Sequence, residues 1–208
     1  PTPDHDLAIG SPALDVIASG ECALADDQRG VARPVGDGCD IGAVEGTVLL
    51  SKHVLPEARP QAGDPITYAL SYQALMTATD LSLVDNLPGE LLDPDWDSAG
   101  MPVTETAPAS FSWDLPDLLP GEGGVVTVTG TVDEDLTPDT LWITNTATLS
   151  FTLPAYGAFT NGQFAPKEIN WPPNITRTPI THTMPEDGDG VADGLIFLYA
   201  EDPNEDIL

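Results

Sequence analysis

The sequence has very few basic residues. Its 6 Lys and Arg stand against 34 Asp and Glu, which gives a formal net charge of −28 over 208 residues. Nucleic acids and anionic membrane surfaces are bound by cationic faces, so we expect neither as a partner. No run of about 18 apolar residues is present, so we expect no direct insertion into a membrane. The acidic balance is compatible with divalent cations and with a highly soluble secreted surface.

The sequence also lacks the short motifs that mark common catalytic sites. Its three histidines, His5, His53 and His182, are scattered along the chain. No nucleophile motif and no Gly-rich phosphate loop occurs. We therefore expect a protein that is not an enzyme.

Aromatic residues make up only 6% of the chain, whereas apolar residues as a whole reach 41%. The core is therefore expected to consist of Val, Leu, Ile and Ala. No long stretch has apolar residues at helical spacing. Instead, 21 Pro and 19 Gly divide the chain into short segments, which is typical of strands and turns. These features predict an all-β protein.

Only two cysteines are present, Cys22 and Cys39, and they lack the CxxC spacing of a zinc or redox site. We expect them to form a disulfide, which would contribute roughly 3 kcal/mol by the loop-entropy estimate. A structural disulfide places the protein outside the reducing cytosol. The expected location is therefore secreted or extracellular.

Residues 1–46 contain apolar runs too short for an independent core, as expected for the last coil of a solenoid. The runs SPALD, DQRGVARP and CDIGAVE resemble the C-terminal end of right-handed β-helix domains in bacterial surface proteins of the choice-of-anchor and polymorphic-outer-membrane-protein type. The resemblance implies that a parallel β-helix precedes residue 1. It also implies that Arg29 and Arg33 pair with nearby carboxylates such as Asp27 and Asp40 to close the cap.

Apolar and polar residues alternate clearly in residues 47–151. Strands are expected at 48–54, 66–72, 81–87, 125–132 and 141–151, separated by turns, which predicts an immunoglobulin-like antiparallel β-sandwich. The pattern K…GDPITYALSY…LSLVDNLPGEL…TVTGTV…ITNTATL resembles the DUF-eleven repeat domain and the isopeptide-forming fimbrial domains, which are immunoglobulin-like modules of bacterial cell-surface proteins. The sequence departs from that pattern at residues 74–79, where a polar turn with Asn and Gly is usual.

Three polar residues, Lys52, Asp85 and Asn145, fall on the apolar face of three of these strands. Alternate residues of a strand lie on the same face. Lys52 therefore shares a face with Val48, Leu50 and Val54. Asp85 shares one with Leu81, Leu83 and Leu87, and Asn145 shares one with Ile143, Ala147 and Leu149. Burying an isolated charge is very costly. We therefore expect the three side chains to meet.

In the isopeptide-forming domains, a buried Lys amine attacks the side-chain amide carbon of an Asn. A neighbouring carboxylic acid, whose pKa is raised by burial, polarises the carbonyl and transfers the proton. The resemblance implies such a bond between Lys52 in the first strand and Asn145 in the last, with Asp85 assisting. The alternative is that Lys52 reaches solvent from an edge strand and that Asn145 caps a turn.

Residues 152–183 are rich in Pro and are expected to form an extended linker with some strand character. Residues 184–208 offer two alternative calcium sites. Asp187, Asp189 and Asp193 match part of a DxDxDGxxD loop, although Pro185 stands at the first ligand position and cannot bind. The segment PED…LIFLYAEDPN resembles the opening of a cadherin-like repeat, and the resemblance implies Glu186 and Asp202 as the calcium ligands.

Residues 195–200 form a strongly apolar segment that we expect to be a strand. Neighbouring copies of the chain could cover it by β-strand addition, and head-to-tail addition makes a filament. Our first hypothesis is a structural segment of a secreted bacterial surface fibre or stalk. The alternatives are an adhesin or carbohydrate-binding module, and a spacer in a larger extracellular hydrolase.

Overall fold

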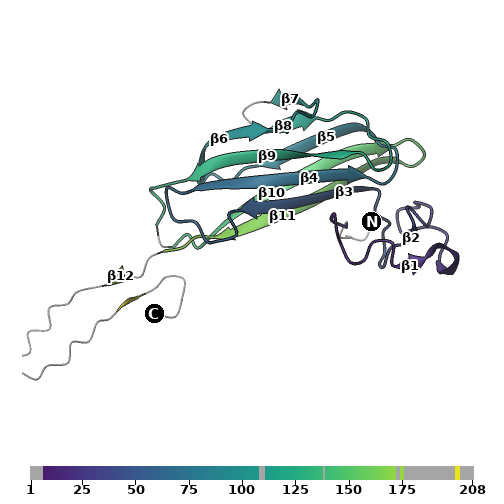
Figure 1. The fold of residues 1–208 in the computed structure, drawn as a ribbon, viewed down its shortest axis with the longest axis horizontal. Coiled ribbons are helices and arrows are strands. Elements are labelled where there is room, and N and C mark those ends of the chain that lie inside the picture. The colour runs from purple at the N-terminus through teal and green to yellow at the C-terminus, as the bar shows by residue number, and fades with distance from the viewer. Residues whose placement is uncertain (1–6, 108–110, 138, 172–173, 176–199, 202–208) are drawn as a thin grey trace, which may run out of the picture.

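The protein is an antiparallel β-sandwich preceded by a compact N-terminal segment (Figure 1). The computed structural model describes residues 7–107, 111–137, 139–171, 174–175 and 200–201. Within these residues, no helix is both long enough and apolar enough to cross a membrane. The prediction of an all-β sandwich is confirmed.

Two sheets form the sandwich. In spatial order, the first sheet contains β11 (Gly157–Glu168), β10 (Trp142–Leu153), β5 (Thr79–Asn86), β8 (Ser112–Asp114) and β7 (Thr104–Ala107). The second contains β3 (Val48–Leu55), β4 (Pro65–Ala74), β9 (Gly123–Val132) and β6 (Leu91–Asp97). Strands β11 and β3 are edge strands of different sheets, and they lie against each other along one side of the sandwich.

The core lies between the inner faces of the two sheets. Burial alternates along β4, β9 and β10, because successive side chains of a strand point to opposite faces. The fully buried indole of Trp113 on β8 lies edge-on to Trp96, with ring centroids 5.4 Å apart. The predicted alternation of apolar residues thus fills the core in the register that the sequence specifies.

Strand β11 lies where the sequence analysis placed a Pro-rich linker. It pairs with β10 over its full length, from Glu168 opposite Trp142 to Gly157 opposite Leu153. Pro166 is tolerated because β11 is an edge strand, where a missing N–H can face away from the ladder. The sandwich therefore continues beyond residue 151, and Asn145 lies in the penultimate strand of the sandwich rather than in the last.

Residues 7–46 have little regular structure, with β1 (Ile17–Ala18), the 3-10 turn η1 (Ser19–Glu21) and β2 (Gly38–Cys39). The expected disulfide between Cys22 and Cys39 is present. None of these elements tests the predicted β-helix, which stays a prediction.

Buried carboxylates organise the N-terminal segment. Arg29 pairs with Asp27 at 2.8 Å, as expected. Arg33 instead pairs with Glu45 at 2.6 Å, and it reaches only the main-chain oxygen of Asp40. The Asp40 carboxylate is occupied differently, because it accepts hydrogen bonds from two backbone amides, those of residues 15 and 46. Arg33 therefore pairs with a nearby carboxylate, as expected, but that carboxylate belongs to Glu45 and not to Asp40.

The N-terminal segment packs onto the sandwich near the start of β3. The side chains of Leu14 and Leu49 both lie close to Gly46, where no Cβ would fit without displacing them. Leu49 is buried although it points away from the sandwich core. The Arg29 guanidinium lies over the ring of Phe159 on β11, 5.3 Å from its centroid. These contacts join the segment to both edge strands.

Beyond residue 171, the structure describes only β12 (Asn174–Ile175) and β13 (Ala200–Glu201), which pair with each other. Residues 195–199 of the expected apolar strand lie outside the described residues. The same holds for all five expected calcium ligands, which are Asp187, Asp189, Asp193, Glu186 and Asp202.

We expect the disulfide to stabilise the N-terminal segment and not the sandwich. Replacing Cys22 and Cys39 by Ser should lower the stability of residues 7–46 by roughly 3 kcal/mol, because the unfolded loop regains its freedom. Hydrogen exchange of the full chain would show this as lost amide protection in residues 7–46, with protection in β4 and β9 unchanged. Lost protection in β4 and β9 instead would contradict the assignment.

Candidate functional site

Lys52, Asp85 and Asn145 meet inside the sandwich. Lys52 comes from β3 of one sheet, whereas Asp85 and Asn145 come from the paired strands β5 and β10 of the other. Asp85 binds both partners: its Oδ1 accepts a hydrogen bond from Lys52 Nζ, and its Oδ2 accepts one from Asn145 Nδ2 at 3.2 Å. The side chains of Lys52 and Asp85 are fully buried. Lys52 thus points into the core and not to solvent.

This Lys–Asp–Asn cluster is buried beside the aromatic ring of Tyr68. Lys52 Nζ lies 5.1 Å from the ring centroid of Tyr68 on β4. The Tyr68 hydroxyl and Asn145 Oδ1 are both buried, and neither has a hydrogen-bond partner among the described residues. A buried polar atom without a partner is costly, so the site holds unused hydrogen-bonding capacity beside a charged pair.

Burial shifts the pKa values of the pair toward each other. It lowers the pKa of Lys52, and the charge of Asp85 opposes this shift only in part. Burial raises the pKa of Asp85, against the opposing effects of Lys52 and Asn145. Both shifts favour the neutral forms, so moving a proton from the ammonium to the carboxylate costs less here than in water. The cluster can therefore supply a neutral amine next to a carboxylic acid.

A second buried lysine, Lys167 on β11, lies near the end of the same seam between β3 and β11. Its Nζ donates hydrogen bonds to the main-chain oxygens of Pro56 and Glu57, the latter at 2.8 Å. Next to it, Arg59 pairs with Glu168 at 2.8 Å. Lys167 was not predicted as a buried residue, because it lies in the region expected to be a linker. The available signal was its parity with Ala165, which is also buried.

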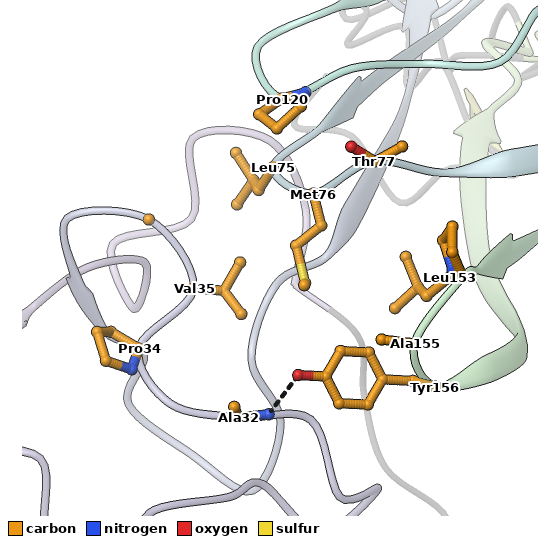
Figure 2. A pocket seen from close by; sticks show the side chains of 12 residues that line it. Ala32, Pro34, Val35, Leu75, Met76, Thr77, Pro120, Leu153, Ala155 and Tyr156 are labelled. Atoms are coloured by element: carbon orange, nitrogen blue, oxygen red, sulfur yellow. Dashed lines mark hydrogen bonds between the residues drawn. The ribbon is translucent and has the colours of Figure 1, made fainter.

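An open apolar pocket of about 520 Å³ lies where the N-terminal segment meets the ends of β4 and β10 (Figure 2). Val35 from the segment faces Met76 from the β4–β5 turn and Leu153 from β10. The hydroxyl of Tyr156 accepts a hydrogen bond from the backbone amide of Ala32 at 3.5 Å. No charged residue lines the pocket, and its only polar side chains are the hydroxyls of Thr77 and Tyr156, so it offers mainly apolar contact.

The described residues contain no cluster of three or more His, Cys, Asp or Glu side chains placed to hold a metal ion. The calcium site expected in residues 184–208 lies outside them and stays a prediction.

No family model and no curated protein matches the chain. Among solved structures, the major pilin subunit BcpA of Bacillus cereus is 15% identical, with a TM-score of 0.47 over 62% of this chain and 42% of that chain. The full-length major pilin SpaD from Corynebacterium diphtheriae is 16% identical, with a TM-score of 0.47 over 66% of this chain and 40% of that one.

A collagen-binding subdomain of the Enterococcus faecalis surface protein ACE is 10% identical, with a TM-score of 0.36 over 57% of this chain and 95% of that one. The chain matches less than half the length of the two pilins. We take no function from likenesses at this level.

The carboxylate of Asp85 should stabilise the charged form of Lys52 in the core. We expect Asp85→Ala, made in an Asn145→Ala background that prevents any crosslink, to cost about 3–5 kcal/mol, because it leaves a buried ammonium without its carboxylate. Denaturant unfolding of the single and double variants measures the difference. Adding Lys52→Met to the double variant is the control and should recover most of the loss. A cost below about 1 kcal/mol would show that no unpaired ammonium is left in the core, either because Lys52 is neutral there or because it finds another acceptor.

Proposed function

We propose that the sandwich is a tension-bearing module of a secreted bacterial surface fibre or stalk, crosslinked by an isopeptide bond between Lys52 and Asn145. The proposal is carried by the buried cluster in which Asp85 touches both residues. Burying a lysine, an acid and an asparagine on three strands costs free energy, so a gain in stability alone does not account for them. Together they make up the reactants and the proton carrier of an amide exchange.

The proposed reaction needs no cofactor. With the proton on Asp85, the neutral amine of Lys52 attacks Cγ of Asn145. A half-turn of the Asn145 amide exchanges Nδ2 and Oδ1, so that the protonated carboxyl of Asp85 can donate to Oδ1 and polarise the carbonyl. A bond then forms between Lys52 Nζ and Asn145 Cγ, and the Cγ–Nδ2 bond breaks. Nδ2 leaves as ammonia, with one proton that Asp85 carries over from the amine.

Such a bond suits a protein that carries tension. It would join β3 to β10 and close a covalent loop around residues 53–144, which include most strands of both sheets. Force applied along the chain would pass through the bond and not through these strands. The disulfide in the N-terminal segment agrees with a location outside the reducing cytosol.

The arrangement of the two ends supports assembly end to end. The N-terminal segment lies at one end of the sandwich, and the chain leaves toward β12 at the other (Figure 1). In the proposed fibre, the partners are further copies of this chain, joined head to tail by strand addition of residues 195–200, or other parts of a larger surface protein.

Intact mass tests the bond. We expect the unreduced wild-type chain to weigh about 17 Da less than its disulfide-bonded sequence mass, because bond formation releases ammonia. Lys52→Arg, Asp85→Ala and Asn145→Ala should each keep the full mass. Peptide mapping should also find one peptide pair linked through Lys52 and Asn145. A wild-type chain that folds and keeps its full mass would refute the bond.

Electron microscopy tests the fibre. We expect the concentrated chain to form filaments one subunit wide, and a chain without residues 195–208 to remain monomeric, because it lacks the strand to be added. Circular dichroism of both forms checks that the sandwich still folds. If filaments persist after the deletion, the subunits must contact one another through another surface.

A further inference from the structure

We infer that Lys167 latches β11 to the crosslinked part of the sandwich and so sets the force at which this strand detaches. The inference rests on the proposed Lys52–Asn145 bond. It concerns residues that the bond leaves unprotected.

The position of Asn145 in β10 decides which residues those are. Tension that enters through β3 would cross to β10 at Asn145. From there it must follow the backbone through the rest of β10, around the turn and along β11. Residues 146–168 therefore lie in series with the bond and not inside the loop that it closes. Only non-covalent contacts hold them.

Force applied to the C-terminal part of the chain would act on β11 at its C-terminal end. Glu168 pairs with Trp142 and Ala165 pairs with Asn145, so β11 leaves the sheet level with the crosslink. The last residues of β11 are thus the first to be pulled. Their contacts decide whether the strand stays in place.

Lys167 makes its contacts at this point. The carbonyls of Pro56 and Glu57 that accept its hydrogen bonds follow β3 directly, inside the covalent loop. Because the donor is an ammonium, these are charge-assisted hydrogen bonds, which are stronger than neutral ones. Lys167 is only 6% exposed.

Neighbouring contacts follow the same pattern. Asn170 N donates to Pro60 O at 2.7 Å, and the Trp171 indole N–H donates to Thr140 O at 3.0 Å. Each joins the exit of β11 to a residue inside the loop. Lys167 is the buried member that also belongs to the strand itself. Glu168, the last residue of β11, also pairs with Arg59 of the loop at 2.8 Å, so tension passes from β11 to the closed loop through this pair and through the buried ammonium of Lys167.

Single-molecule stretching of the full chain between reference domains tests the latch. For the wild type, we expect the extension assigned to β11 to be limited to roughly 80 Å, from residues 146–168 at about 3.3–3.6 Å per residue. Lys167→Met removes the ammonium and keeps the aliphatic chain. At constant force, this step should occur at least about tenfold faster in the variant, since two charge-assisted hydrogen bonds are lost.

Thr160→Ala, an exposed change on the same strand, is the matched control and should leave the rate unchanged. The loss of about 17 Da should persist in both variants, and it shows that each has folded and crosslinked. If Lys167→Met lacks that loss, Lys167→Gln replaces it, since its shorter donor cannot keep both bonds, and the step should again be faster.

An unchanged rate in a crosslinked Lys167 variant would overturn the latch and leave the bond intact. Full mass in the wild type would overturn the proposed function first. An extension that includes residues 53–144 in a crosslinked wild type would overturn the path of tension on which the latch depends.

Discussion

The hydrogen-bonded pair of Lys52 and Asp85 constrains the whole sandwich. Removing an ammonium and a carboxylate from water costs several kcal/mol for each ion, and good mutual geometry is needed to offset that cost. The pair spans both sheets, so it fixes β3 relative to β5. A slip of one residue in either strand would turn one charge outward and strand the other in the core. Asp85 also binds Asn145, which extends the same constraint to β10.

Polar side chains also close the side of the sandwich where β3 and β11 meet. No backbone ladder joins these two edge strands. Instead, Asn161 Nδ2 donates to Val48 O at 3.2 Å near one end of the seam, and Lys167 binds two carbonyls near the other. Side-chain donors thus satisfy carbonyls of β3 and of the loop after it. The seam is held by fewer and more localised contacts than the ladders within each sheet.

The sequence predicted the parts of the fold in which the period of two is clean. Lys52, Asp85 and Asn145 could be placed on inner faces because apolar residues flank each at alternate positions. Strand β11 could not be recognised in the same way, since its buried positions include Asn161 and Lys167 and its exposed ones include Phe164. Pro166 further weakened the pattern.

Hydrogen-bond and ion-pair partners that depend on tertiary geometry could not be predicted from the sequence either. The acceptors of Lys167 are main-chain carbonyls, which every residue possesses, so no residue type marks them. Arg33 had acids at several spacings, and the fold, not proximity in sequence, selects Glu45 over Asp40.

The Lys and Arg side chains are bound within the protein, which affects how copies of the chain interact when they lie close together. Five of the six Lys and Arg residues are described, and each binds a carboxylate or carbonyl of the same chain. They are therefore engaged within one molecule, while most of the 34 acids remain uncompensated. Copies lying side by side would repel one another over about 8 Å at physiological salt. In the proposed fibre, lateral association of filaments would then depend on ionic strength. Filaments would stay separate at low salt and associate side by side at high salt.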